Sequence, residues 1–578
     1  MRMHKCDVLV VGSGGAGLRA AVEAAEAGAD VIVATKGVPG ACGTTYTAAS
    51  DWMAFGAAFG HADEADSPKE HWIDIMVKGG LLCTPELARA IAEDAPDRFQ
   101  ELEDWGADFD KTDDGKFVQI LSDGARYARA CGRGADTGPI IVNVLMDRCR
   151  AINAEDGPGS VEFLPRTMIV DVAVDGGAVH GAWGVGVEDD EPVAISTPSV
   201  VLASGGAGEL YAINVFPGGQ TGDGYAAALR AGCPLVNFEF IQIGPSIVHP
   251  INFALSGVFW RLNPEITNVV GEEFIPRYVP EGVDVDEAIY IKGVSYPFTI
   301  RNASKWVDVG VFTEISEGRG TEHRGVYMSL AHLEDHVIET EACVPFEHLL
   351  KHGLDLRKEA IEFAPAIQHF NGGARIDLQG ATCINGLFAA GENAGGQHGA
   401  DRPGGNALAD SQVFGRRAGE AAAAVNGDAD ADFVRQFAED GVAALASTDG
   451  GEDVDAIIGD LSWRMWKGAS VVRTEDSLSG ALSAAEEAAE RLANASGSMR
   501  RLAEARNLAL LGRCVAIPAR MRDESRGTHY RADCDAVNDA EWQRQIELSL
   551  ENGEVRAEKQ QRIEMTGELA GLEEKLEG

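Results

Sequence analysis

Glycines close to the N-terminus place the strongest constraint on how this chain can fold. An apolar run at 6–11 leads directly into a glycine cluster, an Ala- and Glu-rich stretch follows at 18–27, and a second apolar run begins at Asp30. The cluster reads Gly12-Ser13-Gly14-Gly15-Ala16-Gly17. Strand, G-x-G-x-x-G, helix and strand within about 30 residues predict a βαβ unit that binds a dinucleotide.

The three motif glycines have separate physical roles in such a unit. Gly12 permits the tight turn, Gly14 lets the backbone approach a pyrophosphate at the positive end of the helix, and Gly17 lets the helix pack closely against the strand. The second strand ends in Thr35-Lys36, where an Asp or Glu usually holds the ribose hydroxyls. Thr35 can make one such hydrogen bond, or it is an ordinary polar residue at a strand end.

The chain carries a large net negative charge. Lys and Arg total 49 against 91 Asp and Glu, so the net charge is −42. Such a surface repels phosphate backbones and anionic lipids, and nucleic-acid binding is therefore not expected. An anionic substrate needs a local cluster of arginines to overcome this field. At about 100–200 residues per domain, the length of 578 residues predicts three to five domain-sized units.

Apolar runs and cysteine spacing bear on location and metal content. No run of 18 apolar residues occurs, so we expect no membrane span. The ten cysteines are scattered and form no C-x-x-C pair, which argues against a structural zinc site or a cysteine-held iron–sulfur cluster, and we expect no metal. The spacing fits reduced thiols, and we expect a cytoplasmic protein or one peripheral to a membrane complex.

Further blocks along the chain carry a family resemblance. They are VVLASGGAG at 200–208, TGDG at 221–224, EISEGRG at 314–320, HFNGG at 369–373, GLFAAGENAGGQHGADRPGGNALADSQVFGRRAG at 386–419 and RDESRGTHYRAD at 522–533. In this order they resemble the flavoprotein subunits of the succinate dehydrogenase and fumarate reductase family, which also includes L-aspartate oxidase. The resemblance covers nearly the whole chain, and the block at 386–419 is highly specific.

The resemblance implies an α/β fold in three parts. We expect a discontinuous, Rossmann-like FAD-binding domain at 1–243 and 355–425, an α+β capping domain at 244–354 and a C-terminal helical domain at 433–578. The alternating pattern at 161–195 predicts a β-meander inserted in the FAD-binding domain. Residues 551–578 are interpreted as a charged helix with a thin apolar stripe, either solvated or in contact with a partner.

The resemblance also implies FAD as cofactor. Members that tether the flavin do so through a histidine, and Thr45 stands at that position, so we expect noncovalent FAD. Glu392, at the end of an apolar run, can accept bonds from ribose hydroxyls, and a helix beginning near Ala407 would stabilise a reduced, anionic flavin. The expected FAD-binding residues are Gly12, Ser13, Gly14, Gly15, Ala16, Gly17, Thr35, Lys36, Thr44, Thr45, Ala48, Ala49, Ala203, Ser204, Gly205, Asp223, Gly391, Glu392, Gly405, Asn406, Ala407 and Leu408.

Four residues are candidates for catalysis. His369 and Arg402 match the family residues that clamp a substrate carboxylate, a role that suits a planar guanidinium. Arg301 resembles the family's proton-shuttle arginine if one extra helical turn is allowed; otherwise it is a surface arginine of the cap. The family's His-Pro-Thr-Gly is missing after Gln242, and His249-Pro250 is the substitute that the sequence offers.

These residues favour an FAD-dependent oxidoreductase that transfers hydride between flavin N5 and a small organic acid. The expected partner is an iron–sulfur or other electron-transfer protein. One alternative is an enzyme similar to aspartate oxidase or adenylylsulfate reductase. Another is a flavin electron-transfer subunit without a small-acid substrate, which the missing His-Pro-Thr-Gly favours and the retained His369 and Arg402 oppose.

Overall fold

A parallel sheet forms the centre of the nucleotide-binding region. The computed structural model describes residues 1–47, 50, 52–155, 157–445 and 450–573. The strands lie in the order β18-β10-β2-β3-β6, and all neighbours are parallel. Their bounds are Leu387–Ala389, Ser199–Leu202, Val8–Val11, Asp30–Thr35 and Ser160–Pro165. The inner strands are apolar and buried on both faces, as helices on each side of a parallel sheet require.

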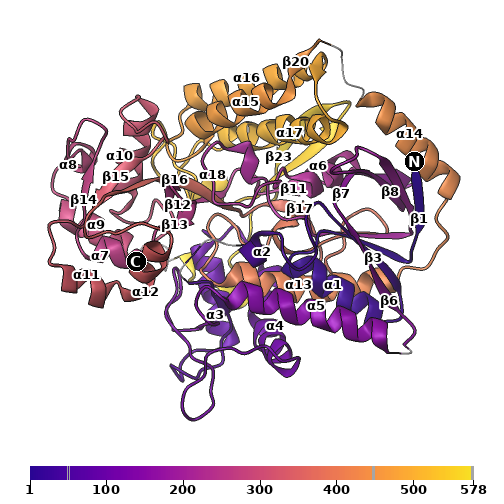
Figure 1. Ribbon diagram of the computed structural model, residues 1–578, viewed down its shortest axis with the longest axis horizontal. Coiled ribbons are helices and arrows are strands. Elements are labelled where there is room, and N and C mark those ends of the chain that lie inside the picture. The colour runs from indigo at the N-terminus through magenta and orange to yellow at the C-terminus, as the bar shows by residue number, and fades with distance from the viewer. Residues whose placement is uncertain (48–49, 51, 156, 446–449, 574–578) are drawn as a thin grey trace.

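Several helices pack against this sheet, against the helices on it or against neighbouring strands (Figure 1). They are α1 (Gly15–Glu26), α2 (Thr44–Thr47), α3 (Pro68–Lys78), α4 (Pro85–Asp104), α5 (Thr137–Ala154), α6 (Asp223–Arg230) and α13 (Asn406–Ala423). Helices α1 and α13 touch backbone to backbone, because a Cβ at Gly419 would lie 2.4 Å from the Ala20 carbonyl oxygen and one at Gly415 would lie 2.8 Å from that of Ala16. This close crossing brings the N-termini of the two helices to one site.

The predicted meander begins later than the sequence indicated. An antiparallel arrangement of β7 (Thr167–Asp175), β8 (Ala178–Gly186) and β9 (Pro192–Ser196) is extended by β1 (Arg2–Lys5), which pairs in parallel with β9. The first expected strand, near 161, is instead β6, the edge of the parallel sheet. The prediction was wrong there because a half-exposed edge strand shows the same alternation as a meander strand.

A second sheet builds the cap, on the left in Figure 1. Its strand order is β13-β12-β16-β15-β14, and its longest ladder joins β12 (Ile241–His249) to β16 (Ile361–Phe370). β12 crosses the predicted boundary at 243, whereas β16 lies wholly within the predicted FAD-binding segment 355–425. The domain boundaries stay a prediction. The remaining elements are β13 (Phe253–Ala254), β14 (Glu265–Thr267), β15 (Val326–Ser329), α7 (Gly257–Arg261), α8 (Ile275–Tyr278), α9 (Val285–Lys292), α10 (Lys305–Ser316), α11 (Asp335–Glu341) and α12 (Cys343–Lys351).

The C-terminal region is helical only in its first part. Its helices are α14 (Ala431–Ala444), α15 (Val454–Ala469), α16 (Glu475–Leu492), α17 (Met499–Met521) and the short α18 (Asp539–Trp542). The hairpin β22 (Ile546–Glu551) and β23 (Glu554–Lys559) then joins β11 (Leu235–Val236), β17 (Gly373–Arg375) and β19 (Ala394–Gly395) in a third sheet. This hairpin therefore packs back onto the FAD-binding region.

The expected helix at 551–578 is wrong for the described residues up to 573. Asn552 and Gly553 have φ values of 52° and 84° and form a two-residue loop between paired Glu551 and Glu554. An Asn-Gly pair with both φ angles positive is the preferred loop of a tight hairpin. This signal was present in the sequence and outweighs the charged, helix-favouring composition around it. Within the described ranges, every helix is too short or too polar to span a membrane.

Candidate flavin and substrate site

The glycine loop between β2 and α1 has two packed glycines and one open one. Gly12 has a φ of +109°, and a Cβ there would lie 2.3 Å from the Ala203 carbonyl oxygen. A Cβ at Gly17 would lie 2.0 Å from the Gly12 carbonyl oxygen. At Gly14 the nearest atom is Thr45 Oγ1, 3.9 Å away. Gly12 and Gly17 are therefore required by packing, and Gly14 faces free space.

Helix α1 begins at this open side without a capping bond from the side chain of its N-cap residue. Gly14 is the N-cap, no side-chain cap bond is present, and the first turn has no acidic residue. The peptide dipoles make this end of the helix positive, so it favours an anionic ligand. The loop thus has the geometry of a pyrophosphate cradle.

Polar side chains from neighbouring segments surround the loop. Ser13 Oγ donates to Thr35 Oγ1 at 3.1 Å, and the Gly15 N–H donates to Thr45 Oγ1 at 3.3 Å. The Ser204 N–H donates to Asn393 Oδ1 at 2.6 Å, which links the second glycine block to the third. Thr44 Oγ1 is buried without a partner. Ala48 and Ala49 lie outside the described residues.

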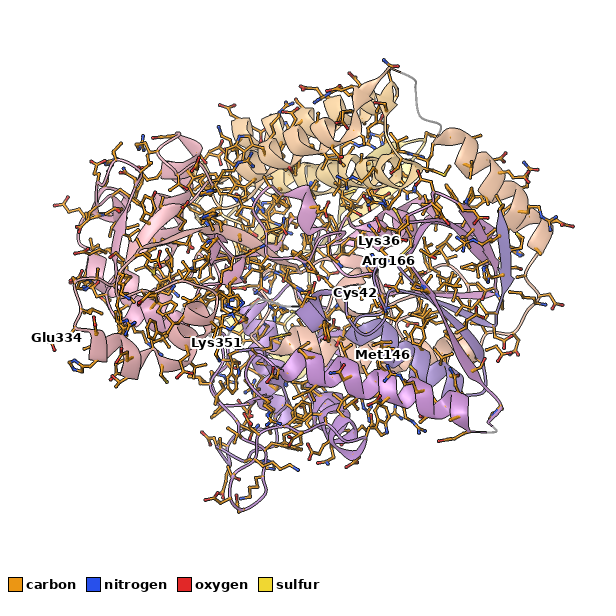
Figure 2. All side chains as sticks on the ribbon, in the orientation of Figure 1. Lys36, Cys42, Met146, Arg166, Glu334 and Lys351 are labelled. Carbon is orange, nitrogen blue, oxygen red and sulfur yellow. The ribbon has the colours of Figure 1, made fainter. Side chains whose placement is uncertain are left out.

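Lys36 and Asp223, two residues expected at the FAD site, form an ion pair. Lys36 Nζ lies 3.0 Å from Asp223 Oδ2 and 2.7 Å from a carboxylate oxygen of Glu504 on α17 (Figure 2 labels Lys36). Asp223 Oδ1 accepts from Thr221 and Asn507. Burial alone would lower the pKa of Lys36, but the two carboxylates raise it above its usual value. This pair joins the FAD-binding region to α17, a role that the sequence did not indicate.

Glu392 follows Gly391, whose φ of +61° turns the chain after β18. Its Oε1 accepts a 2.9 Å hydrogen bond from the Phe370 N–H and lies 3.5 Å from His369 Nδ1. Burial raises the pKa of this carboxyl to about 8, against the lowering effect of the Phe370 N–H and Arg402. Glu392 is thus placed beside His369 at the inner end of the cap ladder.

The N-terminus of α13 presents a second uncapped helix end. Gly405, with a φ of +88°, is the N-cap, and no side chain caps it. A Cβ at Gly405 would lie 2.8 Å from the Gly56 nitrogen, so this turn is tightly packed. Asn406 Oδ1 lies 2.9 Å from His71 Nε2, while Ala407 and the buried Leu408 continue the helix. This end favours a developing negative charge next to it.

Buried polar atoms without hydrogen-bond partners gather on β16, on the segment that leads into α13 and on the first turns of α13. Native proteins pair nearly all such atoms, so a concentration of them indicates a polar ligand. The atoms are His369 Nε2, both ring nitrogens of His398, Arg402 Nε, Asn406 Nδ2, Asp410 Oδ2 and Gln412 Oε1. Together with the two uncapped helix ends, they fit a large ligand that has a charged diphosphate and a polar ring system.

His369 and Arg402, predicted to work together, are neighbours in the structure. Burial lowers the pKa of His369 well below its usual value, and the nearby Arg402 and His398 lower it further. The His369 and His398 ring centroids are 5.6 Å apart. The imidazole of His369 is therefore neutral and offers one N–H, next to the permanent charge of Arg402. A neutral donor beside a guanidinium is suited to bind a carboxylate.

Arg301 reaches the same neighbourhood from the turn before α10. Its guanidinium donates to the carbonyl oxygens of Val77 and Lys78 at the end of α3. Burial lowers the pKa of Arg301, and Asp401 and Asp123 oppose that effect. The same two carboxylates act on Arg402, so Arg301 and Arg402 share Asp401 and Asp123 as electrostatic neighbours.

A bridged set of charges around Asp401 holds this region together. Lys78 Nζ lies 2.9 Å from both Asp123 Oδ2 and Asp401 Oδ2. Gln242 Nε2 donates to Asp401 Oδ1 at 3.0 Å and to the Arg402 carbonyl oxygen at 2.8 Å. Sequence reasoning missed Lys78 and Asp123, which lie outside the family blocks. His398 and Asp410 lie within the block at 386–419 and were not singled out.

His249 does not lie with the other catalytic candidates, so that prediction was wrong. Along the β12–β16 ladder, Gln242 pairs with His369, but His249 pairs with Glu362 seven residues further on. At about 3.3 Å per residue the two pairs are about 23 Å apart. His249 is exposed at the outer end of the strand. A His-Pro pair displaced along a strand cannot replace one at its inner end, because distance along a strand is fixed.

The fold and site together define an FAD-dependent oxidoreductase with a cap over its flavin region. The FAD binding domain family matches residues 7–408, and the fumarate reductase flavoprotein C-terminal domain matches residues 459–568. The chain belongs to this flavoprotein family, whose members include the flavoproteins of fumarate reductase and succinate dehydrogenase and L-aspartate oxidase. FAD is its cofactor.

Three relatives illustrate the match. A subunit of the "Fumarate reductase (CoM/CoB)" of Methanothermobacter marburgensis is 36% identical, and the match covers 95% of this chain and 97% of that protein. The Mycobacterium smegmatis Sdh1 structure in complex with UQ1 has a TM-score of 0.88 at 30% identity, covering 100% of this chain and 98% of the other. An E. coli quinol fumarate reductase structure has a TM-score of 0.83 at 26% identity and covers 98% of both chains.

Proposed function

We propose that this chain interconverts a small unsaturated organic acid and its saturated form, with Arg402 and His369 binding a substrate carboxylate. The observation that carries this proposal is that Arg402 Nε and His369 Nε2 are both buried without a partner, with the charge of Arg402 acting on the His369 ring. Two buried donors without acceptors are costly unless a ligand supplies the acceptors. A carboxylate does so with the geometry that a guanidinium prefers.

Each side chain has a defined task in this proposal. FAD, when bound, supplies hydride transfer to or from the carbon–carbon bond next to the carboxylate. Arg402 orients the carboxylate, and neutral His369 donates its single N–H to it. Gln242 holds the Arg402 backbone through the Arg402 carbonyl oxygen. It also contacts Asp401, the preceding residue, which pairs with Lys78. Arg301, near Asp401 and Asp123, delivers or accepts the proton at the second carbon.

The substrate has a carboxylate at one end and a less charged group at the other. His-Pro-Thr-Gly is missing after Gln242, where this chain has Ile243-Gly244-Pro245-Ser246. A Cβ at Gly244 would lie 2.5 Å from Gln368 Nε2 and 2.8 Å from a ring carbon of Tyr296. No second cationic clamp is provided there by these three residues. We therefore expect enoates with a single carboxylate to compete well with fumarate, the acid named for the Methanothermobacter relative.

A screen of the reduced protein tests this function. Reduced flavoprotein is mixed with fumarate, with monocarboxylic enoates and with saturated analogues as controls, and flavin reoxidation is followed without oxygen. At least one enoate should reoxidise the flavin rapidly, and no saturated analogue should. Failure of every enoate, with normal reoxidation by artificial one-electron acceptors, would instead support an electron-transfer subunit that has no small-acid substrate.

We propose that FAD is held noncovalently. Thr45, at the position of the family's tethering histidine, carries a hydroxyl that accepts from the Gly15 N–H and is no nucleophile for the flavin. Acid precipitation should therefore release FAD into the supernatant. Flavin that stays with the precipitated protein would contradict this assignment.

The electron partner is proposed to be an iron–sulfur or similar redox protein. The chain has no C-x-x-C pair, and the Methanothermobacter relative is by name one component of a larger enzyme. An aspartate-oxidase-like reaction, in which oxygen accepts the electrons, is the second candidate, because the sequence after Gln242 departs from His-Pro-Thr-Gly. Hydrogen peroxide formed from an amino acid in air distinguishes the two.

A further inference from the structure

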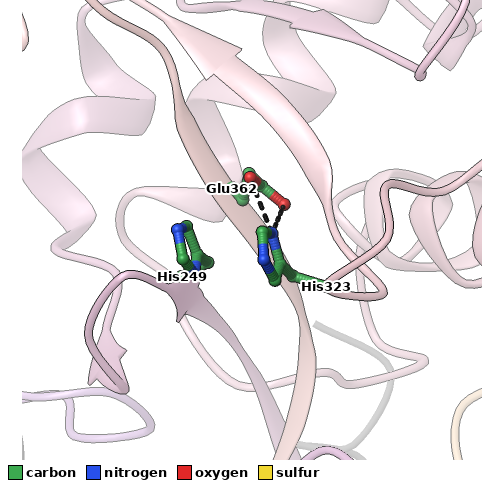
Figure 3. Close-up of side chains that lie close together, drawn as sticks. All are labelled: His249, His323 and Glu362. Carbon is green, nitrogen blue, oxygen red and sulfur yellow. Dashed lines mark hydrogen bonds and ion pairs between the residues drawn. The ribbon is translucent and has the colours of Figure 1, made fainter.

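Three ligand-type side chains meet at the outer end of the β12–β16 ladder (Figure 3). His249 ends β12, Glu362 lies near the start of β16, and His323 lies on the turn between α10 and β15. One nitrogen or oxygen atom of each lies within 4.8 Å of the others. The group was not evident in the sequence, because long stretches of chain separate its members.

The contacts within this group are close. His323 Nδ1 lies 3.1 Å from both carboxylate oxygens of Glu362. The imidazole rings of His249 and His323 are parallel, with their centroids 3.6 Å apart. The side chains of His323 and Glu362 are 35% and 14% exposed, so solvent reaches the group while the carboxylate is largely held inside.

The backbone beneath the group is fixed by two independent pairings. His249 and Glu362 are partners across an antiparallel ladder, which places their side chains on the same face. Tyr327 pairs with Glu362 from the other side, so β15 and the turn before it are attached to the same residue. The Thr321 N–H donates to the Gly325 carbonyl oxygen at 2.8 Å and closes the turn that carries His323.

A neighbouring hydroxyl orients the carboxylate of this group. The Thr321 hydroxyl donates to Glu362 Oε2. Ligating carboxylates and imidazoles in metal sites usually have such outer partners. A simple ion pair between His323 and Glu362 would form without the stacked His249 and without the Thr321 hydroxyl that orients the carboxylate. Two imidazoles with one oriented carboxylate are instead the donor set of transition-metal sites.

We propose that His249, His323 and Glu362 bind one divalent transition-metal ion of the Zn²⁺, Co²⁺ or Ni²⁺ class, with water in the remaining positions. The ion replaces the proton between His323 and Glu362 and joins the end of β12, the 321–325 turn and β16. It has no part in the flavin chemistry, because its residues lie about 23 Å along the ladder from the Gln242–His369 pair. Its effect is to stabilise the outer cap.

Zinc binding to the FAD-loaded full-length protein tests the proposal. The protein is stripped with a chelator, dialysed in high salt to screen the acidic surface, and titrated with Zn²⁺ by calorimetry. Wild type should bind one equivalent tightly and show a higher Tm with zinc. His323→Ala and His249→Ala should each lose at least 100-fold in affinity, and Thr321→Val about 10–100-fold.

His336→Ala is the matched control. His336 Nδ1 lies 3.2 Å from the Glu334 carboxylate on the same cap, without a second histidine in that ion pair (Figure 2 labels Glu334). This variant should bind zinc as wild type does. Flavin absorbance and circular dichroism establish that each variant is folded, and Glu362→Gln substitutes for any histidine variant that is not.

Two results would overturn the proposal. Absence of stoichiometric zinc binding to wild type would leave the group as a His323–Glu362 ion pair with His249 stacked on it. Binding of equal affinity and stoichiometry to wild type, His323→Ala and His249→Ala would assign the zinc to carboxylates elsewhere on the surface.

Discussion

The β12–β16 ladder carries a histidine at each end, and the two ends differ in burial and in partners. At the inner end, His369 is buried, and its Nε2 has no partner. At the outer end, His249 is exposed and stacks on His323, which in turn contacts Glu362. The two histidines therefore differ in their surroundings, because only the inner one has a buried ring nitrogen without a partner and the charge of Arg402 nearby. Burial with an unpaired polar atom, more than residue type, marks the site.

The glycine loop allows a similar comparison, between the open position Gly14 and the packed position Gly17. The largest effect of a substitution, a complete loss of FAD binding, is expected at Gly14. Gly14→Val should abolish FAD binding in a folded protein, because its side chain enters the free space where a pyrophosphate would lie. Gly17→Val should instead reduce soluble protein, since its Cβ meets the Gly12 carbonyl oxygen at 2.0 Å. Flavin content per folded protein, by absorbance and circular dichroism, separates the two. Normal FAD content in Gly14→Val contradicts the loop assignment.

A substitution of Arg301 tests which residue transfers the proton at the inner end of the ladder. Arg301→Lys should leave acid binding nearly unchanged and reduce turnover by a factor of about 100 or more, because an aligned proton donor acts in the transition state. Single-turnover reoxidation at varied acid concentration separates binding from chemistry. Arg526→Lys, a nearby arginine held by Glu524 and Asp539, is the control and should keep the rate. A wild-type rate in Arg301→Lys would place the proton route elsewhere.

Glu392 gives the inner end of the ladder a pH dependence. Its pKa is about 8 when folded, against 4.5 as the ordinary value, so the folded state retains a proton that the unfolded chain releases. The resulting stabilisation is complete below pH 4.5 and is lost as pH rises through about 8. Glu392→Gln should flatten this fall, which is on the order of a few kcal/mol. Denaturant unfolding of the flavin-free protein from pH 5 to 9 measures it; an unchanged slope would show that Glu392 is ionised.

The smallest effect is expected at the outer end. His249→Ala should change neither the rate nor the acid affinity of flavin reoxidation, because His249 lies about 23 Å along the ladder from His369. The same single-turnover assay applies, with His369→Ala as the contrasting variant. If His249→Ala lowered the rate of flavin reoxidation more than about tenfold, His249 would have a role in the reaction after all.

The sequence was sufficient for the parts of the fold that short motifs specify. The βαβ unit at 6–35 and the glycine blocks near 205, 391 and 405 lie where their local pattern predicted. The hairpin at 546–559 was missed because composition was weighed above the Asn-Gly pair at 552–553. Lys36 and Asp223 could not be placed from sequence, because their partner Glu504 comes from a distant helix.

The residues of the candidate site also divide into those that the sequence predicted and those that it could not predict. His369 and Arg402 came from contiguous blocks and lie together. Lys78 and Asp123 were missed because tertiary packing alone brings them to Asp401. His249 was misassigned because a His-Pro pair can be recognised in the sequence while its register on β12 cannot.

The carboxylate clamp is the central claim, and Arg402→Lys tests it most directly. Reduced wild-type and Arg402→Lys proteins are mixed rapidly with the enoate identified by the screen, and reoxidation is followed over a range of acid concentrations. An ammonium cannot reproduce the bidentate fork, so the apparent Kd should rise by roughly 10–150-fold, equivalent to about 1.5–3 kcal/mol, with unchanged FAD content. An unchanged Kd in a fully FAD-loaded Arg402→Lys protein would contradict the clamp.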